Sequence, residues 1–176
     1  MEPNQRLAYI GAGSRDGNRL KNMAGVAGAL RRPGIEPLAA SSLYETEPVD
    51  LPGDRTLYNG VLELATTLEA AELMSACLQV EQESGRRRNE DPFRPLDLDL
   101  LLYADLTLHS GDLEVPHPRM HMRRFVLVPL AEVAPQAVHP GLGLSARLLL
   151  EACRDPAVVR RIAPPGAWFE VAGRFR

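Results

Sequence analysis

The sequence predicts an α+β fold in which two helices pack on one face of a mainly antiparallel sheet. Three observations lead to this fold class: short apolar segments with the pattern of strands, amphipathic segments with the period of a helix, and turn residues between them. These segments follow the order β-α-β-β-α-β, and a C-terminal helical extension comes after them. Strands and helices in this split order form a ferredoxin-like arrangement, so we expect that core here.

The first half of the chain supplies three strands and one helix. Residues 6–12 are a short apolar stretch, and the Gly, Asp and Asn residues that follow are typical of a turn. Apolar side chains then recur every three or four positions over 17–31, which predicts an amphipathic helix. Further strands are expected at 35–46 and 57–67, and the loop between them at 49–56 is rich in Pro, Gly and Asp.

A second helix and a charged loop come next. Apolar residues lie on one face of a helix over 69–84, with Thr67 as its expected N-terminal cap and Gly85 as its C-terminal cap. The loop at 86–95 contains several arginines and two prolines and breaks all periodicity. This loop therefore separates the helix from the last strand of the core.

The last part of the chain is expected to hold one strand and two helical segments. Residues 96–103 form an apolar strand that contains two aspartates. The segment 119–135 is helical towards its end, and Pro129 is expected to kink or interrupt it. Residues 144–154 have the pattern of one more amphipathic helix, which would form the C-terminal extension.

Length, composition and charge limit the classes of function. We expect a single domain over residues 1–176, because this length suits one domain and 45% of the residues are hydrophobic. The formal net charge of −3 gives no basic footprint for a nucleic acid. The chain shows no basic-then-apolar leader and no run of about 18 apolar residues, so we expect a cytoplasmic protein with no membrane partner. We also expect a monomer. Cys77 and Cys153 are far apart in apolar surroundings, which indicates buried thiols and not a disulfide.

The aspartates of the strand at 96–103 are the first candidates for chemistry. Asp97 and Asp99 alternate with leucines, so both carboxylates lie on one face of the strand, roughly 6–7 Å apart. Such a pair suits Mg²⁺, which proteins hold by one or two carboxylates together with substrate phosphates. The alternative is a polar face exposed to solvent, or ion pairs with the arginines nearby.

Basic side chains flank this pair on both sides in the sequence. Guanidinium groups around a carboxylate pair are typical of phosphoryl transfer, since they neutralise the charge that develops on phosphate oxygens. The flanking residues are Arg86, Arg87, Arg88 and Arg94 before the strand, and His117, Arg119, His121, Arg123 and Arg124 after it. Each of them alone would be an ordinary surface residue, and only the grouping indicates a site.

Two other motifs give weaker signals. The spacing of Gly11, Gly13 and Gly17 differs from the dinucleotide-binding pattern, and a tight strand-to-helix turn is the better interpretation. Thr46 and Asn59 lie beside a proline-stiffened loop and are able to hydrogen-bond the edge of a flat heterocycle. The alternative for these two residues is plain turn chemistry.

Five stretches together resemble one enzyme family. In chain order they are SSLYETEPV, YNGVLEL, VEQESGRRR, RPLDLDLLLY and VPHPRMHMRRFVLVPLAEVAP. They resemble the 6-hydroxymethyl-7,8-dihydropterin pyrophosphokinases of folate biosynthesis, over about residues 7–135. The resemblance implies a ferredoxin-like fold, ATP as co-substrate and two Mg²⁺ ions. It also implies transfer of the β,γ-pyrophosphoryl group of ATP to the hydroxymethyl group of the pterin, with release of AMP.

The resemblance assigns roles to residues by matching motif. Asp97 and Asp99 would hold the metal ions and act in catalysis with Arg86 and Arg94. The pterin pocket would be lined by Thr46, Val49, Asn59 and Phe125. The ATP side would be lined by Glu81, Arg86, Arg88, Leu100, His117 and Arg123.

The loop at 86–95 departs from the family pattern. It is shorter and lacks the tryptophan that covers the pterin, for which Phe93 is a partial substitute. This leaves a second hypothesis open, a paralogue that binds pterin or nucleotide with altered substrate or little turnover. A ferredoxin-like RNA-binding module is disfavoured, because only 5% of the residues are aromatic and the net charge is acidic.

Overall fold

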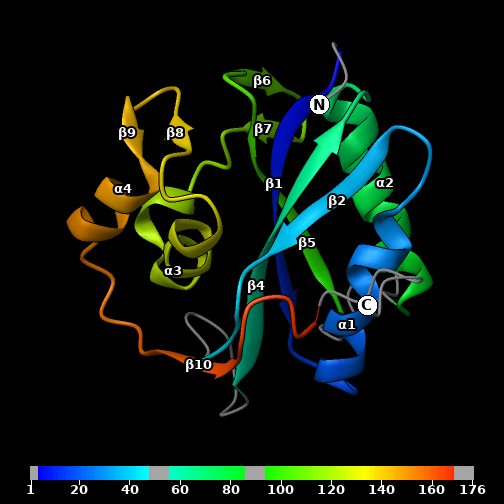
Figure 1. The fold of residues 1–176 in the computed structure, drawn as a ribbon, viewed down its shortest axis with the longest axis vertical. Coiled ribbons are helices and arrows are strands. Elements are labelled where there is room, and N and C mark those ends of the chain that lie inside the picture. Colours follow the sequence, from blue (N-terminus) through cyan, green and yellow to red (C-terminus); the bar gives the residue numbers. More distant parts are fainter. Residues whose placement is uncertain (1–3, 48–55, 86–93, 169–176) are drawn as a thin grey trace.

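A six-stranded sheet forms the centre of the molecule (Figure 1). The computed structural model describes residues 4–47, 56–85 and 94–168. The strand order is β10-β3-β4-β1-β5, β2 also pairs with β4, and every pairing is antiparallel. The strands are β1 (Arg6–Ser14), β2 (Ile35–Ala40), β3 (Leu43–Thr46), β4 (Leu57–Thr66), β5 (Asp97–Tyr103) and β10 (Val159–Ala163). The predicted α+β class with a mainly antiparallel sheet is confirmed.

Helices cover both faces of this sheet (Figure 1). On one face α1 (Arg19–Leu30) and α2 (Ala70–Glu83) bury Met23 and Leu73 against Ile10 and Leu62. On the other face α3 (Arg124–Val133) and the short 3₁₀ helix η1 (Met120–Met122) pack on Leu101 and its neighbours. The two predicted core helices therefore share one face, and α3 leaves part of the other face open.

The C-terminal extension differs from its prediction. The helix predicted over 144–154 is present as Ala146–Ala152 (α4), but up to Trp168, where the described part ends, short strands make up much of the rest. Besides β10, they are the hairpin β8 (Val138–His139) and β9 (Leu144–Ser145). A further hairpin, β6 (Leu108–Ser110) and β7 (Leu113–Val115), precedes η1. β10 was missed because its charged, exposed sequence lacks the alternation of a half-buried strand.

Other elements differ from prediction in detail. The single strand expected at 35–46 is two strands, since the chain leaves β2 at Ser41 and enters β3 at Leu43. Pro129 lies within α3 and does not end it. Cys77 is buried as expected, but Cys153 is only half-buried; both are free thiols.

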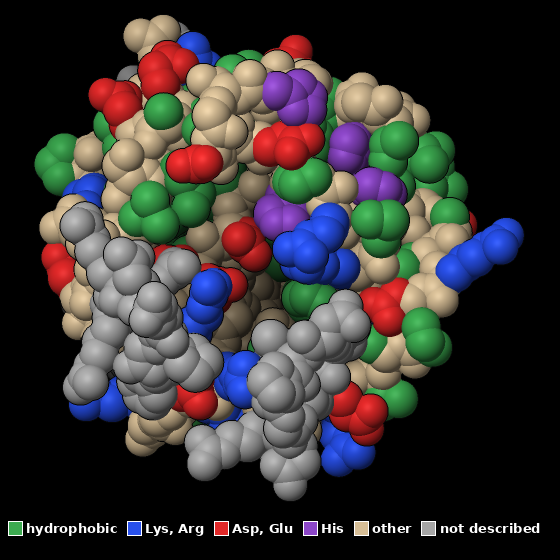
Figure 2. Space-filling model, turned by 180° about the vertical axis from the view of Figure 1, so that it is seen from behind, with side chains coloured by type: hydrophobic (Ala, Val, Ile, Leu, Met, Phe, Trp, Pro, Cys, Tyr) green, Lys and Arg blue, Asp and Glu red, His purple; other side chains and the backbone are tan. Residues whose placement is uncertain are grey.

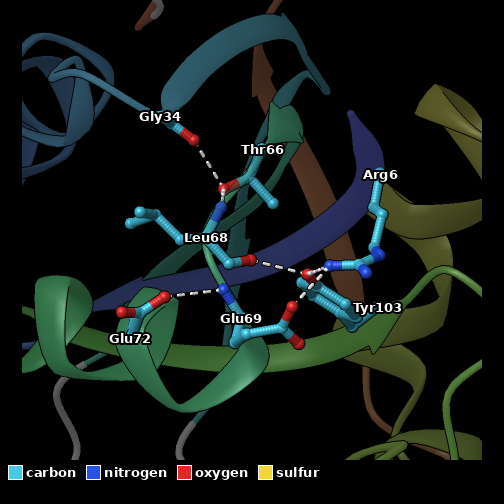
Figure 3. A network of polar contacts seen from close by, with 7 residues as sticks. All are labelled: Arg6, Gly34, Thr66, Leu68, Glu69, Glu72 and Tyr103. Atoms are coloured by element: carbon cyan, nitrogen blue, oxygen red, sulfur yellow. Dashed lines mark hydrogen bonds and ion pairs between the residues drawn. The ribbon is translucent and has the colours of Figure 1, made fainter. Parts of the chain in front are cut away.

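The start of α2 is fixed to the end of β5 by polar contacts (Figure 3). Thr67 was expected to cap α2, but the cap is Glu69, which forms a capping box with Glu72. The hydroxyl of Tyr103 donates to the carbonyl oxygen of Leu68 at 2.6 Å. Gly85 follows α2 with a φ of +97°, as its expected role as a C-terminal cap requires. These contacts hold α2 against the strand that carries the two aspartates.

The opposite layer is held by one carboxylate of α3. Glu132 accepts hydrogen bonds from the backbone N–H and the hydroxyl of Ser42, both at 2.7 Å. The hydroxyl of Tyr44 donates to the same carboxylate at 3.0 Å. Burial, followed by this hydrogen bond, raises the pKa of Tyr44 to about 12.

This shift predicts a loss of stability at alkaline pH. Unfolded Tyr44 loses its proton near pH 10, whereas folded Tyr44 keeps it until about pH 12. The folded state therefore binds more protons in this interval, and the free energy of unfolding falls as the pH rises through it. We expect the free energy of unfolding to fall less in Tyr44→Phe than in the wild type over this pH interval. Urea unfolding at several pH values measures both. Equal falls in the two proteins would contradict this assignment.

Candidate active site

An open cleft of about 980 Å³ lies on the face of the sheet that α3 only partly covers. Its floor comes from β1, β4 and β5, and its walls come from η1, α3 and, at the β5 edge, α2. Figure 2 shows a hollow on this face, around which acidic, basic and histidine side chains gather. The cleft thus brings together segments that are far apart in the sequence.

The two aspartates of β5 face this cleft, as predicted. Asp97 and Asp99 both line it, whereas Leu100 does not, and Leu98 borders the cleft but packs with Leu100 in the core under α1 and α2. Alternation ends at a β-bulge, where the pairing of β1 with β5 shifts between Tyr9 and Ile10. Leu101 keeps the face of Asp97 and Asp99, and the bulge brings Leu102 to the same face, where both leucines join the cluster under α3. This explains the run of three leucines after Asp99.

The electrostatics of Asp99 are those of a crowded carboxylate pair. Burial raises the pKa of Asp99, and the neighbouring Asp97 raises it further. His117, Arg123 and Arg119 lie close enough to oppose this shift with their positive charge. The pair therefore concentrates negative charge in a site where a cation would relieve the repulsion.

Basic side chains surround the pair in space as well as in sequence. A guanidinium nitrogen of Arg94 lies 3.4 Å from a carboxylate oxygen of Asp97, and both side chains are about half exposed. The backbone N–H of His117 donates to the carbonyl oxygen of Leu101 at 2.9 Å, which fixes the histidine beside β5. Burial, then the charges of Arg123 and Arg119, lower the pKa of His117, against the pull of Asp99.

The expected pterin residues Thr46, Asn59 and Phe125 line the same cleft. Thr46 and Asn59 come from neighbouring strands and are 2% and 6% exposed. The amide nitrogen of Asn59 donates to the hydroxyl of Thr46 at 2.7 Å. Phe125 reaches the cleft from the first turn of α3, and the guanidinium of Arg123 lies 5.6 Å from its ring centre. Polar edges and an aromatic face are thus within one pocket.

Two expected ATP-side residues make contacts within the protein. Glu81 is 1% exposed and accepts a hydrogen bond from the backbone N–H of Leu98 at 2.6 Å, although it also borders the cleft. Leu100 is 3% exposed, packs in the core and does not line the cleft. The structure therefore gives both residues a role in holding β5 in place.

Five other residues named from the sequence lie outside the described part of the chain. They are Val49, Arg86, Arg87, Arg88 and Phe93. Their predicted roles remain predictions.

Sequence reasoning missed the anchor of the segment that precedes the aspartates. The side-chain amide of Asn22 donates to the carbonyl oxygens of Pro95 and Asp16, both at 3.0 Å. The hydroxyl of Ser14 donates to the same oxygen of Pro95 at 2.5 Å. The backbone N–H of Arg94 donates to the carboxylate of Asp16 at 3.0 Å. The turn after β1, which had only a connecting role in the sequence, therefore positions Arg94 and the start of β5.

The glycines of β1 leave the floor of the cleft open. Gly11 pairs with Asp99 and Gly13 pairs with Asp97, so a side chain at either glycine would project beside a carboxylate. A Cβ on Gly13 would lie 3.3 Å from the side-chain oxygen of Asn59. Both glycines lie inside a strand, which agrees with the rejection of a dinucleotide-binding turn.

The ligand set suits one kind of cation. Within residues 4–47, 56–85 and 94–168, no three His, Cys, Asp or Glu side chains gather as metal ligands. Two carboxylates beside a cleft are the set that Mg²⁺ takes from a protein when substrate phosphates supply further oxygens. Asp97 and Asp99 fit this role.

The fold and the cleft define a class of protein. It consists of α+β domains whose antiparallel sheet presents a pair of carboxylates to a cleft that arginines and an aromatic side chain also line. Within this class the chain belongs to the 7,8-dihydro-6-hydroxymethylpterin-pyrophosphokinase family, whose model matches residues 9–135. The resemblance seen in the sequence is thereby confirmed.

Two relatives of similar length have the same name, 2-amino-4-hydroxy-6-hydroxymethyldihydropteridine pyrophosphokinase. The protein from Synechocystis is 39% identical over 160 residues, which are 89% of this chain and 80% of the relative. The protein from Bacillus subtilis is 38% identical over 133 residues, 74% of this chain and 79% of the relative.

Other relatives are much longer. The folic acid synthesis protein fol1 of Schizosaccharomyces pombe is 36% identical over 138 residues, and the chain spans only 19% of its length. A crystal structure of Plasmodium falciparum HPPK-DHPS with pteroate has the same fold, with a TM-score of 0.69 at 13% identity. That match covers 86% of this chain and 43% of the other.

The longest described helix, α2, has 14 residues. None of the described helices is both long enough and apolar enough to cross a bilayer.

Proposed function

We propose that this protein transfers the β,γ-pyrophosphoryl group of ATP to the hydroxymethyl group of 6-hydroxymethyl-7,8-dihydropterin, a step of folate biosynthesis. One observation carries the proposal: Asp97 and Asp99 face arginines in the same cleft as Thr46, Asn59 and Phe125. The names of the two relatives of similar length support it, since both are pyrophosphokinases of this pterin.

The reaction needs alignment and charge neutralisation more than covalent work by the protein. The hydroxymethyl oxygen attacks the β-phosphorus of ATP, and the bond from that phosphorus to the oxygen bridging to the α-phosphorus breaks. AMP leaves with the bridging oxygen, and the hydroxyl proton passes to solvent. The products are AMP and the pterin pyrophosphate.

Asp97 and Asp99 are the proposed ligands of Mg²⁺, with two ions expected from the family resemblance. Bound Mg²⁺ supplies positive charge to the phosphate oxygens and orients them. Arg94, Arg123 and His117 add hydrogen-bond donors around the triphosphate. We also place Arg86 and Arg88 there, by their match to the family motif.

The pterin side relies on a stacking face and a hydrogen-bonding edge. Phe125 offers its ring to the pterin, and Thr46 and Asn59 meet the polar edge of the heterocycle. The hydrogen bond from Asn59 to Thr46 fixes the orientation of the Asn59 amide. The groups that would donate to and accept from the pterin are therefore in place before it binds. Val49 completes this pocket in the proposal.

Glu81 and Leu100 act on the ATP side through β5 in this proposal, by holding the strand that carries the aspartates. The cytoplasmic location, the monomeric state and the single domain over residues 1–176 remain predictions from the sequence.

The position of Gly13 at the floor of the cleft gives a prediction that can be checked against a second glycine. We expect Gly13→Val to lower kcat/KM for the pterin about tenfold or more, because overpacking costs ~1–3 kcal/mol and the new side chain crowds Asn59. The control is Gly25→Ala on α1, where an added Cβ meets no atom within 4 Å. Steady-state kinetics checks both variants, and a Gly13→Val enzyme as active as Gly25→Ala would contradict the position of the pterin.

The proposed activity is tested by AMP formation in purified protein. We expect AMP only when ATP, the pterin and Mg²⁺ are all present, in equal amount to the pterin pyrophosphate. Saturable pterin binding without AMP would favour the second hypothesis, a paralogue with little turnover. AMP formed equally well without pterin would overturn the proposal.

A further inference from the structure

The C-terminal strap, residues Asp155–Trp168, lies beyond the segment that matches the family model, yet it contacts three sides of the pterin pocket. Its first contact is with α3. The N-terminal cap position of this helix is Arg123, whose side chain makes no capping hydrogen bond. Asp155 supplies the missing acceptor, because its carboxylate accepts from the backbone N–H of Arg124 at 2.8 Å.

This cap comes from 31 positions further along the chain and is itself held in place. The second carboxylate oxygen of Asp155 accepts from the backbone N–H of Ala157 at 2.9 Å. A carboxylate at a helix N-terminus also interacts favourably with the helix dipole. Phe125 follows Arg124 directly in this first turn, so the cap fixes the backbone that presents the aromatic ring to the cleft.

The second contact is with the strand of Thr46. β10 pairs antiparallel with β3, and Val159 lies opposite Thr46. β3 would otherwise be the edge of the sheet, since its other partner is β4. The strap therefore holds Thr46 between two strands, which fixes the hydroxyl that contacts Asn59.

The third contact lies behind the pocket. Trp168 is fully buried, and its indole N–H donates to the carbonyl oxygen of Ser41 at 2.8 Å. Its ring packs on Gly60, the neighbour of Asn59, so closely that a Cβ there would lie 2.4 Å from a ring carbon. Only glycine at this position leaves room for the indole ring, so Trp168 packs directly on the backbone next to Asn59.

We propose that Asp155 is a positioning residue for the pterin, acting through the first turn of α3, and that β10 and Trp168 fasten it there. The inference rests on the proposed function, because it names the residue outside the family match that sets the pterin geometry. It predicts a larger effect on the pterin side than on the ATP side, because Phe125 lies within the capped turn. Arg123 borders this turn and Asp155 itself lines the cleft, whereas Arg94 and the aspartates of β5 make no hydrogen bond with the strap among the described residues.

The test compares Asp155→Ala with Asp155→Asn and with Glu151→Ala, an exposed carboxylate of α4 that makes only a long ion pair with Arg147. Losing a cap weakens a helix end by ~1 kcal/mol, so we expect Asp155→Ala to raise both KM and Kd for the pterin about five- to tenfold. The KM for ATP should rise less than the KM for the pterin, because Arg123 borders the capped turn while Arg94 and the aspartates of β5 lie on other parts of the chain. Asp155→Asn should recover much of the affinity, because its amide oxygen still accepts one hydrogen bond.

Trp168 is the only tryptophan in the sequence, so the tryptophan fluorescence of the protein reports directly on the strap. We expect unchanged emission in Asp155→Ala. In Gly60→Ala we expect red-shifted emission together with weaker pterin binding, because the added methyl group displaces the indole. Unchanged pterin affinity in Asp155→Ala, or a parallel rise of both KM values with red-shifted emission, would overturn the inference.

Calorimetric binding of the pterin keeps this test separate from that of the proposed function. A wild-type protein that binds pterin but makes no AMP would refute the activity and still allow the affinity comparison. A wild-type protein with full activity and an Asp155→Ala variant with unchanged affinity would refute only the role of Asp155.

Discussion

Replacement of Asp99 by Asn is expected to reduce the rate of AMP formation about 10³-fold, since metal-assisted charge stabilisation is worth several kcal/mol. Asn keeps the volume of Asp99 and the strand pairing with Gly11, so the fold should remain. The variant should also need a higher Mg²⁺ concentration for half-maximal activity, because it offers one negative charge fewer to the cation. Initial rates measured over a range of Mg²⁺ concentrations check both expectations.

The control for this variant is Asp105→Asn. Asp105 is exposed in the turn after β5 and does not line the cleft. Its replacement removes the same charge from the chain, so an effect of net charge alone would appear in both variants. Equal activity of Asp99→Asn and Asp105→Asn would exclude Asp99 as a metal ligand.

Replacement of Leu100 by Ala is expected to lower the free energy of unfolding by about 2–5 kcal/mol, the usual cost of a large-to-small change in a core. Leu100 is 3% exposed and packs under the helices, on the opposite face of β5 from the cleft. A direct contact of its side chain with ATP would instead give a raised KM for ATP and little change in stability. Urea unfolding and ATP kinetics of the same variant separate these two roles.

Leu38→Ala provides the matched comparison. Leu38 is 42% exposed on β2, so its truncation should cost less than about 0.5 kcal/mol. If Leu100→Ala were no less stable than Leu38→Ala, the assignment of Leu100 to the core would be wrong.

Local patterns in the sequence predicted the parts of the site that depend on strand period. The alternation around Asp97 and Asp99 placed both carboxylates on one face and the leucines on the other, and the structure agrees. The order of strands and helices predicted the core, because the split β-α-β-β-α-β pattern has few ways to pack.

Local sequence patterns could not predict contacts between segments that lie far apart in the chain. Glu81 has the spacing of a helix residue, and nothing near it in sequence shows that it binds the N–H of Leu98. Asp155 likewise caps a helix 31 positions earlier in the chain. The bulge in β5 also depends on pairing with β1, which the sequence of one strand does not reveal.

The most direct test of the central claim follows the phosphorus of ATP. With ATP labelled at the β-phosphorus, purified protein, Mg²⁺ and 6-hydroxymethyl-7,8-dihydropterin, the label should appear in the pterin product, with AMP and no labelled ADP as the other product. This result requires attack at the β-phosphorus by a pterin held against Asp97, Asp99 and the arginines of the cleft. Label recovered only as inorganic phosphate or pyrophosphate, with unmodified pterin, would contradict the account.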